Sequence, residues 1–131
     1  MNQKYRIIVA GGRDLEDYEL VHSTLFEYIN HFLDLGSTDS VEIVSGRARG
    51  ADRLGEKFAD EYGYPVKCFE ADWQKYGKAA GPIRNNDMAE YASEDGYYGV
   101  LIAFWDCKSR GTQNMIDIAE RYRLDVKIVG Y

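Results

Sequence analysis

The sequence predicts an α/β protein with a Rossmann-like three-layer sandwich, in which helices cover both faces of a five-stranded parallel sheet. Two observations lead to this prediction: short apolar runs alternate with segments of helical periodicity, and glycine-bearing turns separate them. Alternating strands and helices form right-handed βαβ units, which build parallel sheets. We expect a single domain over residues 1–131, because no repeat or linker divides the chain.

The first half of the chain is expected to supply three strands and two helices. Short apolar runs bounded by turn residues predict strands at residues 5–10, 42–45 and 65–69. Between them, apolar side chains recur at helical spacing over residues 18–33 and 54–62. Glycine adopts the left-handed conformation that ends many helices, so Gly36 and Gly63 are the expected ends of these helices.

The second half is expected to supply two helices and two strands. Proline suits the first position of a helix, so Pro82 is expected to begin the third helix. The most apolar strand follows at residues 99–105, and residues 115–122 mark a fourth helix before a strand at residues 125–129. We expect strand order 3-2-1-4-5. The connections of strands one and four then leave in opposite directions, and this switch point is the usual ligand crevice of such sheets.

Composition argues against several classes of protein. The net charge of −6 makes an extended nucleic-acid partner unlikely, because nucleic-acid backbones are bound by basic surfaces. The sequence has no membrane-spanning apolar run and no signal-peptide pattern, so no membrane partner is expected. Cys68 and Cys107 match no zinc or redox spacing, which predicts a reduced, cytoplasmic protein without a metal site.

Three segments combine glycine with arginine at expected helix starts. They are residues 47–53 (RARGADR), 77–88 (GKAAGPIRNNDM) and 109–112 (SRGT). Helix starts present unpaired N–H groups and partial positive charge, which favour anions. The expected strand order brings these segments and the loop after the first strand to one crevice. The sequence therefore predicts a site for a phosphorylated ligand.

The standard nucleotide motifs are absent from the sequence. No G-x-G-x-x-G follows the first strand, and the second strand ends in Ser45 where a dinucleotide-binding fold has an acidic residue. Ala79 stands where a P-loop has its Ser or Thr. NAD chemistry and NTPase activity are therefore disfavoured, and no cofactor is expected.

Arg84 and Asn85 follow Pro82 near the expected start of the third helix. Arg84 is expected to form a bidentate pair with a phosphate or carboxylate of the ligand, and its alternative role is an ion pair with Asp87 or Asp106. Asn85 has two open roles, capping of backbone groups or binding of a ribose hydroxyl.

Three further residues have specific expected roles. Asp52 is interpreted as a helix cap and an ion partner of Arg49 or Arg13, Trp73 is expected to stack on a base, and Thr112 is expected to cap the last helix. The complete set of expected ligand-binding residues is Gly11, Gly12, Arg13, Gly46, Arg49, Asp52, Trp73, Gly81, Arg84, Asn85, Ser109, Gly111 and Thr112.

The basic and glycine-rich motifs also carry a family resemblance. They are residues 9–14 (VAGGRD), 45–53 (SGRARGADR), 71–85 (ADWQKYGKAAGPIRN) and 109–112 (SRGT). Together they resemble the YspA-core family of the SLOG superfamily of Rossmann-like domains. This resemblance covers nearly the whole chain and implies a protein that binds or senses a nucleotide or a nucleotide-derived signal, with no settled activity; binding is favoured over catalysis.

The Lonely Guy phosphoribohydrolases of the same superfamily imply an alternative function, cleavage of the base from a nucleoside 5′-monophosphate. Their R-K-x-x-M and G-T-x-x-E elements are similar to Arg84 with Met88 and to residues 111–115, but Met115 stands in place of the catalytic Glu. Glycosidic cleavage needs a carboxylate. The candidate acids elsewhere are Asp14, Asp72 and Asp117. Likeness to these hydrolases also implies a possible homodimer.

The DNA-processing protein A domain, which binds single-stranded DNA, implies a second alternative. Its R-R-N and S-G-S-x-x-T-A elements resemble residues 84–85 and 109–112. Single-stranded DNA binding would require affinity that rises with oligonucleotide length.

Overall fold

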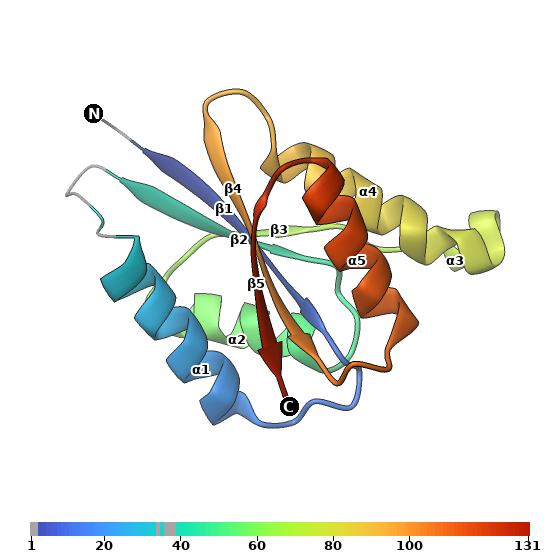
Figure 1. Cartoon of the computed structure of the whole chain (residues 1–131), viewed down its shortest axis with the longest axis horizontal. Helices are drawn as coiled ribbons and strands as arrows, with labels where there is room; N and C mark the ends of the chain where they lie inside the picture. The colour runs from blue at the N-terminus through green and yellow to red at the C-terminus, as the bar shows by residue number, and fades with distance from the viewer. Residues whose placement is uncertain (1–2, 34, 36–38) are drawn as a thin grey trace.

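Five parallel strands form one sheet in the computed structural model, which describes residues 3–33, 35 and 39–131. The order is β3-β2-β1-β4-β5, so the predicted fold class and strand order are confirmed (Figure 1). The strands are β1 (Lys4–Gly11), β2 (Ser40–Ser45), β3 (Val66–Cys68), β4 (Tyr97–Trp105) and β5 (Asp125–Gly130).

Helices cover both faces of the sheet. Figure 1 shows α1 and α2 on one face, α4 and α5 on the other, and α3 extending away from the sheet. No helix in the described ranges has the length and apolarity needed to cross a membrane. The helical elements are α1 (Tyr18–Glu27), the π-helical turn η1 (Tyr28–Phe32), α2 (Ala51–Tyr62), α3 (Trp73–Tyr76), the 3-10 turn η2 (Gly77–Ala79), α4 (Ala80–Ala92) and α5 (Arg110–Arg121).

The central strand β1 is buried on both faces. Ile7 and Val9 pack in the apolar cluster beneath α1 and α2, whereas Ile8 packs in the cluster beneath α4 and α5. Successive side chains of a strand point to opposite faces, which explains this division. A strand covered on both faces is apolar along its length, and this property made residues 5–10 recognisable in the sequence.

The switch point lies between β1 and β4. These strands pair in parallel from Lys4 with Tyr97 to Gly11 with Phe104, so their carboxyl ends lie side by side. The chain leaves β1 towards α1 on one face of the sheet and leaves β4 towards α5 on the other. The loops after the two strands therefore diverge at this edge, as predicted.

The predicted start of the third helix is wrong. α4 begins at Ala80, and Pro82 is its third residue. The first-turn N–H groups of a helix have no partner within the helix, so proline is tolerated there beyond the first position. The helical turns of α3 and η2 between residues 73 and 79 were also not expected. Asp72 begins α3, since its Oδ1 accepts a hydrogen bond from the Lys75 N–H at 3.1 Å.

Of the two predicted helix ends, Gly36 and Gly63, the structure confirms only Gly63. α1 stops at Glu27 and continues as the π-helical turn η1 through Phe32, while the expected end, Gly36, lies outside the described residues. Gly63 follows α2 in the left-handed conformation with φ +75°, so this predicted helix end is confirmed.

Candidate functional site

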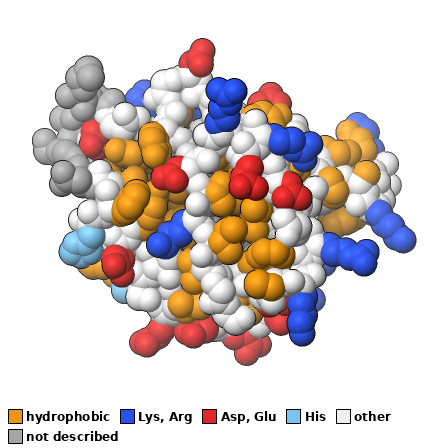
Figure 2. All heavy atoms as spheres, in the orientation of Figure 1, with side chains coloured by type: hydrophobic (Ala, Val, Ile, Leu, Met, Phe, Trp, Pro, Cys, Tyr) orange, Lys and Arg blue, Asp and Glu red, His pale blue; other side chains and the backbone are white. Residues whose placement is uncertain are grey.

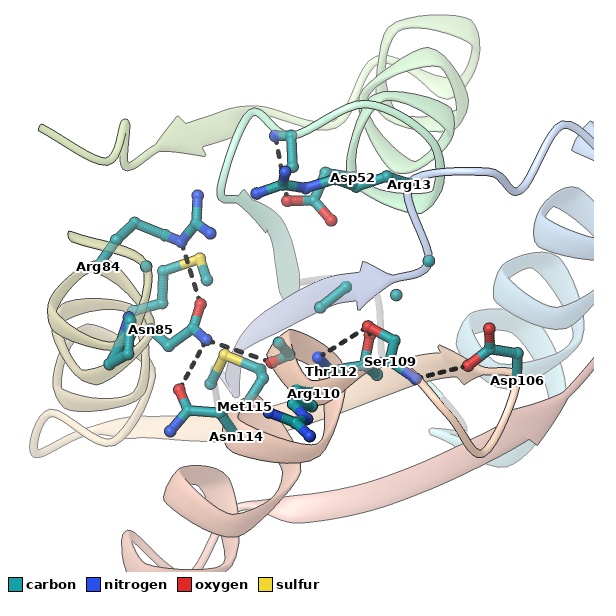
Figure 3. Close-up of a pocket in the computed structure, with 18 of the residues that line it drawn as sticks. Arg13, Asp52, Arg84, Asn85, Asp106, Ser109, Arg110, Thr112, Asn114 and Met115 are labelled. Carbon is teal, nitrogen blue, oxygen red and sulfur yellow. Dashed lines mark hydrogen bonds between the residues drawn. The ribbon is translucent and has the colours of Figure 1, made fainter. Parts of the chain in front are cut away.

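A cavity of about 610 Å³ opens at the carboxyl ends of β1 and β4. It has a volume typical of small-ligand sites. Figure 3 shows side chains from the loop after β1, from α2, from α4 and from the start of α5 around it. Eleven of the thirteen expected ligand-binding residues line it: Gly11, Gly12, Arg13, Asp52, Trp73, Gly81, Arg84, Asn85, Ser109, Gly111 and Thr112.

Glycine backbone holds the start of α2 against the loop after β1. The Ala51 N–H donates to the carbonyl oxygen of Gly12 at 3.1 Å. Gly50 has φ +79°, and a Cβ atom on it would lie 2.1 Å from the same oxygen. At Gly11, a Cβ would lie 2.3 Å from the carbonyl oxygen of Phe104. Side chains at these positions would push apart the segments that form the cavity.

Arg84 extends from α4 across the cavity wall. Its Nη1 donates to the carbonyl oxygen of Gly46 at 2.5 Å, and its Nε donates to Asn85 Oδ1 at 3.0 Å. Desolvation lowers the pKa of the guanidinium, while the Asp52 carboxylate acts in the opposite direction. The predicted alternative of an ion pair with Asp87 or Asp106 is wrong, because within the described chain Arg84 pairs with neither.

Asp52 presents a buried carboxyl group to the same cavity, with 5% of the residue exposed. Its Oδ2 accepts a hydrogen bond from the Ala48 N–H at 3.3 Å. Burial raises the pKa of Asp52 to about 6; Arg84, the Ala48 N–H and Arg13 lower it, and Glu56 raises it. The predicted capping role is wrong, because Gly50 is the N-cap of α2 and Asp52 lies in its first turn.

Neither of the two ion partners expected for Asp52 pairs with it within 4.0 Å among the described residues. Arg13 acts on Asp52 from a greater distance, since its charge lowers the pKa of the carboxyl group, against the larger effect of burial. Gly46 leaves room for the side chains of Arg84 and Asp52, since a Cβ on it would lie 2.9 Å from both Arg84 Nη1 and Asp52 Oδ2.

Asn85 joins α4 to α5 at the floor of the cavity. Its Nδ2 donates to Asn114 Oδ1 at 3.0 Å and to the carbonyl oxygen of Gly111 at 3.5 Å (Figure 3). Its Oδ1 accepts from Arg84 Nε, so the buried amide uses both of its ends within the protein. Asn85 therefore fixes the position of Arg84 relative to α5, and its contact with a ribose stays a prediction.

Ser109, rather than Thr112, caps α5. The Oγ of Ser109 accepts from the Thr112 N–H at 3.3 Å and from the Thr112 hydroxyl at 3.1 Å. Asp106 Oδ1 accepts from the N–H groups of Lys108 and Ser109, both at 2.8 Å, and these bonds lower the pKa of Asp106. The predicted cap at Thr112 is wrong, because the serine three residues earlier already takes its N–H.

Trp73 lies at the rim of the cavity and is 49% exposed. The Arg13 guanidinium lies 5.8 Å from its ring centroid, and a Cβ on Gly81 would contact the ring at 3.4 Å. The ring is therefore held from one side by α4 and keeps substantial exposed surface. A stacked base is the ligand group that would use this surface.

The three candidate acids of the hydrolase alternative lie in different places. Asp14 lines the cavity and accepts a hydrogen bond from the Tyr131 hydroxyl at 2.7 Å. Asp72 caps α3 and Asp117 accepts from Gln113 Nε2 at 2.9 Å, and neither lines the cavity. Met115 does line it, fully buried, and its thioether cannot transfer a proton.

Apart from Asp14, four polar lining residues, Lys78, Asp106, Arg110 and Asn114, are not in the expected set of ligand-binding residues, although Lys78 and Arg110 lie within the predicted phosphate segments. Lys78 and Arg110 each adjoin a glycine of the predicted phosphate segments, and this adjacency was the available signal. Asn114 lies one helical turn after Arg110, so the helical period could have placed it on the same face. Within the described ranges, no group of three His, Cys, Asp or Glu residues is arranged to hold a metal ion.

Gly46 and Arg49, the two remaining expected site residues, line a neighbouring cavity of about 350 Å³. It adjoins the first cavity, because Arg13, Trp73 and Arg84 line both. The structure thus brings all thirteen expected residues to one edge of the sheet, and their contact with a ligand stays a prediction.

The fold and the basic crevice at its switch point define a Rossmann-like α/β protein with a candidate anion site. A sequence model of the YspA, cpYpsA-related SLOG family matches residues 5–76, more than half of the chain. The chain therefore belongs to this family, as its motifs predicted.

One relative is similar over almost its full length. The Gene 61 protein of Mycobacterium phage D29 is 26% identical over 126 residues, which cover 92% of this chain and 93% of that protein.

Two solved structures align with nearly the whole chain, and the first of them is similar in fold. DNA processing protein A (DprA) of Streptococcus pneumoniae matches 96% of this chain with a TM-score of 0.66 and 17% identity. The match spans 50% of DprA, so the chain corresponds to half of that protein. A predicted subunit of tRNA methyltransferase from Methanocaldococcus jannaschii matches 96% of this chain and 67% of its own, with 15% identity and a TM-score of 0.40.

Proposed function

We propose that the protein binds a nucleotide, or a nucleotide-derived phosphorylated ligand, in the crevice at the carboxyl edge of the sheet. The observation that carries the proposal is the convergence of cationic side chains on one cavity. Arg13 comes from the loop after β1, Arg84 from α4 and Arg110 from α5, and Lys78 adds a fourth cation from η2. Guanidinium groups bind phosphate through paired, charge-assisted hydrogen bonds.

The four cationic side chains of the cavity outnumber its three carboxylates, Asp14, Asp52 and Asp106. Asp106 accepts two backbone N–H groups, and Asp14 accepts the Tyr131 hydroxyl. Asp52, with a pKa raised to about 6 by burial, is ionised for the most part at neutral pH and becomes neutral in mildly acidic solution. Figure 2 shows basic side chains over α3 and the start of α5, and acidic ones along the lower edge near α1. The basic crevice is thus a local feature of an acidic protein.

The start of α5 adds backbone donors to the same cavity. Among the described residues, the N–H groups of Arg110 and Gly111 have no hydrogen-bond partner. A Cβ on Gly111 would meet nothing within 4 Å, so the backbone here is open to a close approach. Together with the positive end of the helix dipole, these groups support a phosphate at the start of α5.

The proposal is tested by thermal melting and calorimetry with AMP, other nucleoside monophosphates and a short oligonucleotide. A ligand at 100 times its dissociation constant stabilises the fold by about 2.7 kcal/mol, which raises the melting temperature by several degrees. Arg84→Ala should weaken nucleotide binding at least about tenfold, because one charge-assisted pair is lost.

Arg121→Ala is the matched control for this experiment. Arg121 is an exposed arginine at the end of α5, outside the cavity, and its loss changes the net charge equally. Unchanged nucleotide affinity in Arg84→Ala would contradict the placement of the phosphate. Affinity that rises with oligonucleotide length and falls steeply with salt would instead indicate single-stranded DNA binding.

A second candidate function, cleavage of the base from a nucleoside 5′-monophosphate, is favoured by Asp52. A buried carboxyl group with a raised pKa, facing a ligand cavity, is suited to general acid or base catalysis. Asp52 would replace the Glu that the phosphoribohydrolases carry at the position of Met115.

Release of free base during incubation with nucleoside monophosphates is the measurement for this second candidate. Asp52→Asn should abolish the release while leaving nucleotide binding within a few-fold, because the amide keeps the shape of the carboxylate. If the wild-type protein binds nucleoside monophosphates but releases no free base, the hydrolase function is wrong and the nucleotide-binding function stands.

A further inference from the structure

The smaller cavity beside the nucleotide crevice has an unusual lining. Five of its residues are arginines and a single residue is acidic, Glu70. The arginines are Arg13, Arg47, Arg49, Arg53 and Arg84. Six of the nine arginines of the chain line this cavity or its larger neighbour, although the protein carries a net charge of −6. The overall composition therefore does not account for this lining.

Protein carboxylates neutralise only part of this charge. Arg47 Nη1 pairs with Glu56, and its Nε lies 3.7 Å from Glu70. Within the described residues, Arg49 and Arg53 have no carboxylate within 4.0 Å. Arg53 is held in place by its Nε, which donates to the carbonyl oxygen of Arg47 at 3.0 Å. Converging guanidinium groups without counter-charges repel one another, and a bound anion would relieve this repulsion.

The two cavities form a continuous surface. Arg13, Trp73 and Arg84 line both of them, so these side chains stand at the boundary. A volume of about 350 Å³ exceeds the need of a phosphate group alone and leaves room for an attached sugar. One ligand could therefore reach from the start of α5 past Arg84 to Arg49 and Arg53.

We propose that the smaller cavity is a second phosphate subsite, and that the ligand carries two phosphate groups separated by at least one ribose, as in a 5′-phosphorylated dinucleotide. This inference rests on the proposed nucleotide function and specifies its ligand. The first phosphate lies near Arg84, Arg110 and the start of α5. The second lies between Arg49 and Arg53, which pair with no carboxylate in the described part of the chain.

Isothermal calorimetry with the four nucleoside 5′-monophosphates and the matching 5′-phosphorylated dinucleotides tests the subsite. In the wild-type protein, at least one of the dinucleotides should bind at least about tenfold more tightly than the matching nucleoside monophosphate. Arg49→Ala should weaken the dinucleotide far more than the monophosphate, and so remove most of this difference. Arg49 is exposed and makes no ion pair within the described chain, so the variant should fold normally. Arg121→Ala, with the same change in net charge, should retain the full difference.

The possible results separate the two proposals. If monophosphates bind and dinucleotides bind no more tightly, or if Arg49→Ala weakens both ligands equally, the subsite is wrong and the nucleotide function stands. If no nucleotide of either kind binds, both proposals are wrong. Affinity that continues to rise from two to four and eight nucleotides would overturn the two-phosphate ligand in favour of a nucleic-acid strand.

Discussion

A substitution of Gly111 should affect ligand binding and the stability of the fold in opposite directions. It is the second residue of α5, it lines the larger cavity, and a Cβ there would meet no protein atom within 4 Å. Gly111→Ala should therefore keep or raise the stability of the fold, by up to about 1 kcal/mol, because alanine is the better helix former. The added methyl group should weaken nucleotide binding. Melting curves and calorimetry of the same variant would measure both effects, and unchanged affinity would place the ligand elsewhere.

Asp52 should make stability depend on pH in a direction opposite to that of most carboxylates. Its pKa rises from 3.8 to about 6 on folding, so between these values the folded protein binds more protons than the unfolded chain. Asp52 then costs increasing stability as pH rises through this window. The free energy of unfolding of Asp52→Asn, relative to wild type, should increase by up to about 3 kcal/mol from pH 3.8 to about 6.

Urea titrations of the two proteins across this pH range would measure the difference. Comparing the two proteins cancels the titration of groups that do not interact with Asp52. A difference that stays constant with pH would show that Asp52 keeps its ordinary pKa in the folded protein.

Individual site residues were predictable where one strong local rule applied. Glycine and arginine close together, in the loop after the first strand and at expected helix starts, led to Arg13, Arg84 and Gly111, which line one cavity. The cap of α5 was misassigned because Ser109 and Thr112 both suit a cap, and only the backbone geometry decides between them. The burial of Asp52 was not predictable, because it depends on Gly46 and Arg84, which belong to other elements.

At the scale of elements, two glycines with similar φ but different ψ angles, −128° at Gly50 and 21° at Gly63, have different consequences. Gly50 and Gly63 have φ +79° and +75°, but a Cβ would lie 2.1 Å from the Gly12 oxygen at Gly50 and would meet nothing at Gly63. Gly63→Ala should cost about 1–2 kcal/mol, the usual strain of the left-handed conformation. Gly50→Ala should cost clearly more, because its φ of +79° and ψ of −128° strongly favour glycine and because α2 must also move away from the loop after β1. Equal losses in denaturant titrations would contradict this role of Gly50.

Strands were predicted more closely than helix boundaries. The predicted strand at residues 99–105 is observed as β4 from Tyr97 to Trp105, because a doubly buried strand is apolar nearly throughout. The start of α4 at Ala80 was missed, since nothing local forbids proline in the third position of a helix. The short α3 carries no buried residue, so it has no apolar periodicity to detect.

For the whole molecule, we expect protection from hydrogen exchange to decrease from the centre of the sheet to its edges. Ile7, Ile8 and Val9 of β1 are fully buried, whereas all three residues of β3 are exposed. The amides of β1 and β4 should therefore exchange only through global unfolding, and those of β3 through local opening. Native-state exchange followed by NMR would measure this order. Protection of residues 66–68 equal to that of β1 would contradict it.

The whole fold was predictable because alternating strands and helices allow few topologies, and the order 3-2-1-4-5 is the simplest of them. The convergence of distant motifs followed from this order. The division of the basic surface into two adjoining cavities did not, because it depends on how Arg13, Trp73 and Arg84 lie between them.

The last residue of the chain affects how the protein should be handled in the laboratory. The Tyr131 hydroxyl bonds to Asp14 at 2.7 Å, and a Cβ on Gly12 would collide with that hydroxyl, so the carboxyl terminus lies at the rim of the crevice. A purification tag or fluorescent fusion attached after Tyr131 would begin beside the entrance and compete with ligands. The same addition before Lys4, at the opposite edge of the sheet, would leave the entrance open.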